Sequence, residues 1–227
     1  MTKIFILIIV IVLILIIFWI ISRSTEIKTG DISLSELAKI ADNGDLIFLS
    51  GSTVSEKFCK KLINSPFSHV GFLFRELHPE TGENILYIWD SDIGQKCKEG
   101  TRVMPLKQKL IQYKGQKVGG FKQLNGKRPE LKDILDIIPL HLSKNFDSKF
   151  LWSWITSYSP HQNSNKKNVF CSELIASTLQ NLGIMKDIYP AASYHPGDFL
   201  EEKNLYLQDG YSYGKMSIFS FDHKIQK

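Results

Sequence analysis

Cysteine is scarce in this sequence, which has three among its 227 residues. A small odd number excludes a framework in which every cysteine forms a disulfide, and it favours a reducing compartment. The cysteines and the six histidines also lack the spacings of a zinc site. We therefore expect neither a bound metal nor another cofactor.

An excess of charge of one sign is almost absent as well. The net charge of +5 is spread along the chain without a long basic block, so a nucleic-acid partner is not expected. The sequence contains no internal repeats, and its length suits one globular domain.

One long apolar run is present, over residues 4–21. As a helix it would span about 27 Å, close to the thickness of a bilayer's hydrocarbon core. No small-residue cleavage site follows it, which favours an uncleaved anchor over a signal peptide, and it has no polar face. We therefore expect a single-pass membrane protein whose partner through residues 4–21 is the lipid bilayer. Basic residues at both ends leave the orientation undecided.

The sequence divides into a transmembrane anchor at 1–23, a stalk at 24–43 and one domain at 44–227. In the domain, strands and helices occur in clusters, which predicts an α+β fold with a mostly antiparallel sheet. Strands are expected over 45–50, 68–77, 86–92, 101–105 and 118–124. Helices are expected after the capping box of Thr53 and Glu56 and over 106–113, 129–138 and 172–182. Residues 205–221 predict a hairpin around Asp209 and Gly210.

Cys171 stands at the start of the most regular of these helices. A helix N-terminus carries about half a positive charge, which favours a thiolate, and its unpaired N–H groups can stabilise an oxyanion. Cys171 is therefore a candidate nucleophile. The alternative is a small apolar residue packed at a helix start.

A nucleophilic thiol also needs a base and a group that orients the base. His69 begins a predicted strand among apolar residues. Asp90 and Asp92 lie on the apolar face of the next strand, where an unpaired carboxylate is costly. Pairing between them gives a Cys–His–Asp hypothesis, with Asp92 as an alternative third residue and a satisfied core histidine as the alternative for His69.

Four segments resemble the circularly permuted papain-fold hydrolases: GDLIF (44–48), FSHVGFLF (67–74), LYIWDSD (86–92) and FCSELIASTLQNLGI (170–184). This NlpC-like group includes the YiiX/YaeF-type amidases, a poxvirus relative and, more remotely, the lecithin:retinol acyltransferase family. The resemblance covers residues 42–199. It implies Cys171 as nucleophile, His69 as general base and Asp90 as third residue, where the YiiX-like group usually has Glu. His195 is a rival base.

The resemblance implies a permuted papain-like fold with a mostly antiparallel sheet packed on helices. It also implies a thiol hydrolase or acyltransferase that acts on an amide or ester bond through a thioester acyl-enzyme. Because the expected anchor would hold the site near headgroups, a lipid or lipid-linked substrate is favoured. The alternative is a catalytically inactive papain-like scaffold that acts as a membrane or virion interaction protein.

Overall fold

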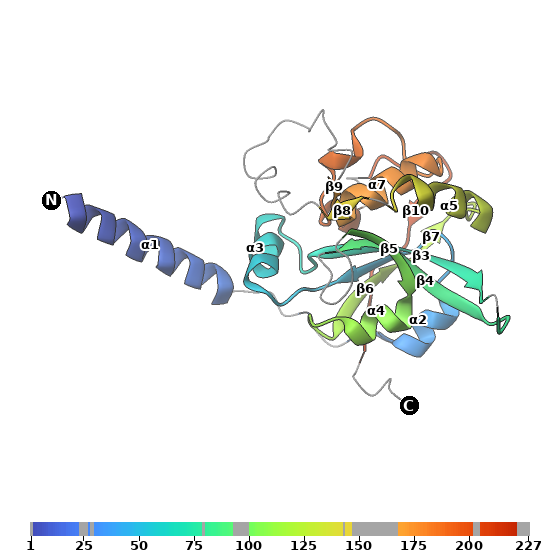
Figure 1. Cartoon of the computed structure of the whole chain (residues 1–227), viewed down its shortest axis with the longest axis horizontal. Coiled ribbons are helices and arrows are strands. Elements are labelled where there is room, and N and C mark those ends of the chain that lie inside the picture. The colour runs from blue at the N-terminus through green and yellow to red at the C-terminus, as the bar shows by residue number, and fades with distance from the viewer. Residues whose placement is uncertain are drawn as a thin grey trace.

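The computed structural model of the chain describes residues 2–22, 27, 30–78, 80–92, 100–142, 144–146, 168–201 and 205–221. These residues form an α+β fold around a seven-stranded sheet of order β1-β11-β6-β2-β3-β4-β5 (Figure 1). Its strands are β1 (Ile32–Ser33), β2 (Leu46–Leu49), β3 (His69–Leu77), β4 (Asn84–Asp92), β5 (Gly100–Pro105), β6 (Val118–Lys122) and β11 (Ser217–Ser220). Two short pairs complete the strands: β7 (Leu124–Asn125) with β10 (Ser212–Tyr213), and β8 (Asn145–Phe146) with β9 (Asn168–Val169).

The seven-stranded sheet is mixed. Its edge strand β1 runs parallel to β11, whereas the other neighbouring pairs in this sheet are antiparallel. The central strand β2 is buried at every position, because it pairs with β3 on one side and β6 on the other.

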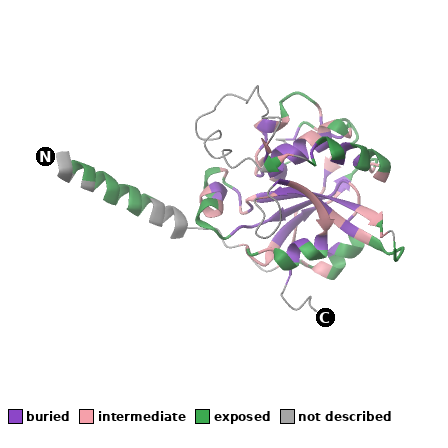
Figure 2. Cartoon of the chain, in the orientation of Figure 1, coloured by how far each residue is buried: buried purple, intermediate pink, exposed green. Residues whose placement is uncertain are grey.

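Helices cover both faces of this sheet. On one face lie α5 (Leu131–Ile137) and α7 (Cys171–Asn181), and on the other lie α2 (Leu34–Ile40) and α4 (Leu106–Gln112) (Figure 1). Apart from α1, which is described below, the other helices among the described residues are α3 (Val54–Leu62) and the 3-10 turns η1 (Ile138–Leu140), η2 (Ala191–Ser193) and η3 (Asp198–Leu200). The sheet between the two layers is mostly buried (Figure 2).

The alternation of side chains along β3 supplies both layers. Val70, Phe72 and Phe74 pack in the cluster beneath α7, whereas Leu73 packs in the cluster that includes Leu106 of α4. Successive side chains of a strand point to opposite faces, so one strand contributes to two apolar cores.

The helix starts follow local sequence signals closely. The predicted capping box is confirmed: Glu56 N–H donates to Thr53 Oγ1 at 3.3 Å, and Thr53 N–H donates to Glu56 Oε2 at 2.9 Å. α7 begins at Cys171, within one residue of the prediction. α5 begins at Leu131 after Glu130 as N-cap.

The N-terminal apolar run is helical, and α1 (Thr2–Ser22) extends away from the sheet (Figure 1). Among the described residues, no helix combines the length and the apolarity needed to cross a membrane. The prediction of a transmembrane anchor at 1–23 is therefore wrong.

Parts of both flanks join the sheet. Within the segment expected as a stalk, β1 pairs with β11, and Leu37 of α2 is fully buried. The predicted hairpin over 205–221 is wrong, because β10 pairs with β7 and β11 pairs with β6 and β1. Tyr213 on β10 also donates its hydroxyl to Gly44 O at 2.9 Å. The strand is therefore additionally held by a loop that is distant in the sequence.

Candidate active site

His69 and Asp90 lie on neighbouring antiparallel strands. His69 is the first residue of β3, and the register that pairs Phe72 with Trp89 places it, when continued, opposite Asp92 and diagonal to Asp90. Leu86 and Ile88 pack in the cluster beneath α4, so the alternation of β4 directs Asp90 and Asp92 to that same face. The prediction that Asp90 and Asp92 lie on the apolar face of this strand is confirmed.

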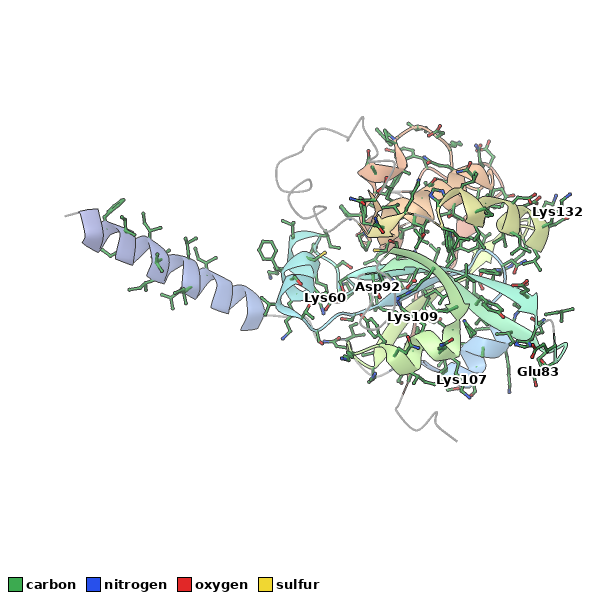
Figure 3. The ribbon with its side chains drawn as sticks, viewed as in Figure 1. Lys60, Glu83, Asp92, Lys107, Lys109 and Lys132 are labelled. Atoms are coloured by element: carbon green, nitrogen blue, oxygen red, sulfur yellow. The ribbon has the colours of Figure 1, made fainter. Side chains whose placement is uncertain are left out.

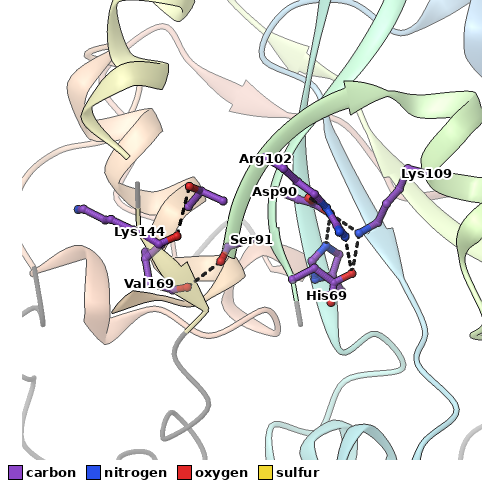
Figure 4. Close-up of polar contacts among 9 residues, drawn as sticks. His69, Asp90, Ser91, Arg102, Lys109, Lys144 and Val169 are labelled. Atoms are coloured by element: carbon purple, nitrogen blue, oxygen red, sulfur yellow. Dashed lines mark hydrogen bonds and ion pairs between the residues drawn. The ribbon is translucent and has the colours of Figure 1, made fainter. Parts of the chain in front are cut away.

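The His69 ring is hydrogen-bonded to Asp90, with 2.9 Å between Nε2 and Oδ2 (Figure 4). Asp90 is fully buried, and His69 is 7% exposed. A buried carboxylate needs partners, and Asp90 has three: His69, Arg102 and Lys109. The hydrogen bond fixes the ring and leaves Nδ1 as the nitrogen that can exchange a proton elsewhere.

Two cations hold the carboxylates of this site. Arg102 on β5 is the direct cross-strand partner of Asp90, and its Nε lies 3.1 Å from Asp90 Oδ1 while its Nη2 lies 2.8 Å from Asp92 Oδ2. Lys109 on α4 contacts Asp90 Oδ2 and lies 2.7 Å from Asp92 Oδ2 (Figure 4). Each cation therefore bridges both carboxylates.

The cations decide the charge of the carboxylates. Burial raises the pKa of Asp90, but the charge of Lys109, the hydrogen bond from His69 and the charge of Arg102 outweigh it and hold this pKa below its ordinary range. Burial likewise works against the Asp92 anion, yet Lys109 and His69 lower the pKa of Asp92 to about 2. Both groups are carboxylates at neutral pH.

Cys171 is brought to the same end of the sheet from the opposite face. Ser91, the residue after Asp90, donates its hydroxyl to Val169 O at 2.7 Å, which ties β4 to the segment that enters α7 (Figure 4). Ser172 donates to Tyr194 O at 2.8 Å and secures the other side of the helix start. The N-cap Phe170 offers no side-chain acceptor to the first turn of α7.

Cys171 lies near enough to His69 for its thiol to act electrostatically on the ring. Burial lowers the pKa of His69, and so does the charge of Lys109. The charge of Cys171 and the hydrogen bond to Asp90 prevail and raise this pKa from 6.5 to about 10. The structure pairs His69 with Asp90, and the third predicted residue, Cys171, lies within electrostatic reach of the ring.

His195 lies in the segment that follows η2. Its Nδ1 is 3.4 Å from Asp198 Oδ2, and its backbone N–H donates to the same carboxylate at 2.8 Å. The preceding residue, Tyr194, contacts Ser172 beside the start of α7. His195 is therefore close to this helix, but the buried hydrogen bond to Asp90 and the electrostatic interaction with Cys171 favour His69 as the base.

His69, Asp90 and Asp92 each offer a ligand atom within 4.8 Å of the others, a spacing at which a metal ion could bind. The carboxylates are already ion-paired with Lys109 and Arg102. Two positive charges on the same oxygens oppose a divalent cation. We therefore do not assign these residues as metal ligands.

Sequence reasoning missed Lys109 and Arg102. The signal for Lys109 is its place on the apolar stripe of α4, between Leu106 and Leu110, where it is 2% exposed. Arg102 was expected within a strand, and only the register with β4 shows that it stands opposite Asp90.

Comparisons with known proteins add little to this geometry. No known protein family and no curated protein matches the chain. The structure is similar to the crystal structure of the metalloprotein YiiX from Escherichia coli O157:H7, with a TM-score of 0.46 and 17% sequence identity, over 76% of this chain and 96% of that one. YiiX is one of the proteins after which the group resembled by the four sequence motifs is named. YiiX is described as a metalloprotein, and that property is not carried over to this chain.

Proposed function

We propose that this chain is a cysteine-dependent hydrolase or acyltransferase of the circularly permuted papain type, acting on an amide or ester bond. The observation that carries the proposal is the position of His69, which is hydrogen-bonded to Asp90 and lies within electrostatic reach of Cys171, the first residue of α7. The chain order His69, Asp90, Cys171 is also the order of the permuted group that the motifs resemble.

The reaction begins with the Cys171 thiolate and the His69 imidazolium. The Sγ atom attacks the carbonyl carbon, and the first N–H groups of α7 are available to the developing oxyanion. The tetrahedral intermediate then collapses, the bond to the leaving amine or alcohol breaks, and His69 gives its proton to that group. A thioester on Cys171 remains.

The second half uses neutral His69 as a base. The ring takes a proton from water, or from an acceptor amine or alcohol, whose oxygen or nitrogen attacks the thioester carbon. The carbon–sulfur bond breaks, the acyl group leaves as an acid, ester or amide, and the thiolate–imidazolium pair is restored. Asp90 keeps the ring in one orientation throughout.

The substrate is proposed only as an amide or an ester. The expectation of a lipid-linked substrate depended on a membrane-spanning helix, so the correction at 1–23 removes its support. The two acceptors in the second step separate a hydrolase from an acyltransferase.

The experiment is acylation by p-nitrophenyl acetate, followed by nitrophenolate release and by the mass of the intact protein. We expect a burst with one added acyl group on Cys171, unchanged in Cys59→Ala and reduced to the uncatalysed background in Cys171→Ala. Cys59 is the matched control because it is also a buried free thiol. Equal acylation of the Cys171→Ala protein would contradict the proposal and favour the inactive scaffold.

A further inference from the structure

Lys109 is a buried cation at the centre of the site. Its side chain is 3% exposed, and its ammonium contacts Oδ2 of Asp90 and lies 2.7 Å from Oδ2 of Asp92. The neighbouring Leu106 and Leu110 are buried in the cluster on the same face of the sheet, so α4 is fixed there by apolar packing. The ammonium is held in place from both ends of its side chain.

Lys109 and His69 share one acceptor atom. Oδ2 of Asp90 accepts from His69 Nε2 at 2.9 Å and is also the contact of the Lys109 ammonium. Arg102 takes the other oxygen, Oδ1, at 3.1 Å. The carboxylate is therefore fixed at both oxygens, and the oxygen that orients the ring also contacts the Lys109 ammonium.

If the His69 ring is left out, the formal charges of the four residues around it sum to zero. Asp90 and Asp92 contribute two negative charges, and Arg102 and Lys109 contribute two positive ones. Without Lys109 the cluster beside His69 would carry a net charge of about −1, which would stabilise the imidazolium further. A ring that keeps its proton too tightly transfers it poorly to a leaving group.

We propose that Lys109 is a positioning residue of the reaction proposed above: its ammonium fixes the Asp90 carboxylate against His69 and limits how tightly the ring holds its proton. The inference rests on the proposed function. The charged and ionisable groups around the His69–Asp90 pair come from four elements: Asp90 and Asp92 on β4, Arg102 on β5, Lys109 on α4 and Cys171 on α7. The charge of Lys109 acts directly on His69 and lowers the pKa of the ring.

The test is a titration of the His69 ring nitrogens by long-range 1H–15N NMR in the full chain. Lys109→Met removes the charge and keeps most of the side-chain length, so we expect the pKa of His69 to rise by about 1 unit. Lys109→Arg keeps the charge and should stay within about 0.3 units of wild type. Lys107→Met, an exposed lysine on the same helix, is the matched control and should also leave the titration unchanged (Figure 3).

An unchanged or lower pKa of His69 in a folded Lys109→Met protein would overturn the inference. Should that variant fail to fold, Asp92→Asn tests the same charge balance in reverse. It removes one negative charge and leaves both cations, so the pKa of His69 should fall by about 0.5 to 1 unit. A rise would contradict the inference.

The titration needs no turnover, so the two proposals can fail separately. Absence of an acyl-enzyme on Cys171 with the expected shift of His69 would reject the proposed function alone. An acyl-enzyme that forms in wild type, together with no shift in Lys109→Met, would reject only the role of Lys109.

Discussion

The pKa values of two buried histidines in this chain are shifted in opposite directions. His69 is 7% exposed and its pKa is raised to about 10, whereas His141 is 5% exposed and its pKa is lowered to about 4. Burial favours the neutral ring of both. The difference comes from their partners: His69 has a carboxylate and a thiol, while His141 has Ser177 Oγ at 3.3 Å and the charge of Lys144 nearby.

The comparison shows that burial alone does not make a histidine catalytic. His141 also packs edge-on near Trp89, with 6.5 Å between ring centroids, as a neutral core histidine would. A ring with a pKa of about 4 stays neutral at neutral pH and takes up a proton poorly. Its hydrogen-bond partner, the Ser177 hydroxyl, carries no charge. The site is marked by the groups that face His69, and each prediction below changes one of those partners or its counterpart beside His141.

The largest expected effect follows from the loss of the Asp90 charge. In Asp90→Asn the imidazolium loses its anionic hydrogen-bond partner, so the pKa of His69 should fall by about 1 to 3 units. NMR titration of both rings in one sample measures it, with His141 as the internal control. A titration of His69 that stays at its wild-type value would show that Asp90 does not support the ring.

His141 should make the fold sensitive to acid. Its pKa is about 4 in the folded chain against 6.5 in the unfolded one, so the unfolded state takes up more protons and stability falls as the pH drops from about 6.5 to 4. The contribution is of the order of 3 kcal/mol. Urea unfolding of wild type and His141→Gln at both pH values measures it, and an equal loss in both proteins would refute this account.

Lys144 should have a smaller effect on the same ring. It is half-buried, and its charge is the second cause, after burial, of the low pKa of His141. In Lys144→Met we expect the pKa of His141 to rise by about 0.3 units, because a partly solvated charge is screened. NMR titration decides it, and a fall would contradict the assigned cause.

Removal of metal should have no effect. Since Lys109 and Arg102 neutralise Asp90 and Asp92, incubation with EDTA should leave both the pKa of His69 and the acylation of Cys171 by p-nitrophenyl acetate unchanged. A loss of acylation that zinc restores would show that these carboxylates bind a metal.

Local patterns predicted the elements of the site well. The alternation of β4 placed Asp90 and Asp92 on one face, and the start of α7 was predicted to within one residue of Cys171. Both follow from periodicity and from interactions within a few residues. The catalytic roles of these residues stay predictions.

Long-range packing was harder to predict. Lys109 becomes an ion-pair partner only because α4 packs beneath β4, and an isolated lysine in a short helix is more often solvated. The hairpin at 205–221 failed for the same reason, since β10 and β11 find partners far away in the sequence.

The most direct test of the central claim is the rate at which iodoacetamide alkylates Cys171 at pH 6. Cys59 is the reference within the same molecule, since burial and the nearby charges of Cys171 and Glu56 raise its pKa to about 12. We predict that Cys171 reacts at least about 100-fold faster than Cys59, and that His69→Ala slows it at least about 10-fold. A rate that is unchanged in His69→Ala would contradict the thiolate–imidazolium pair.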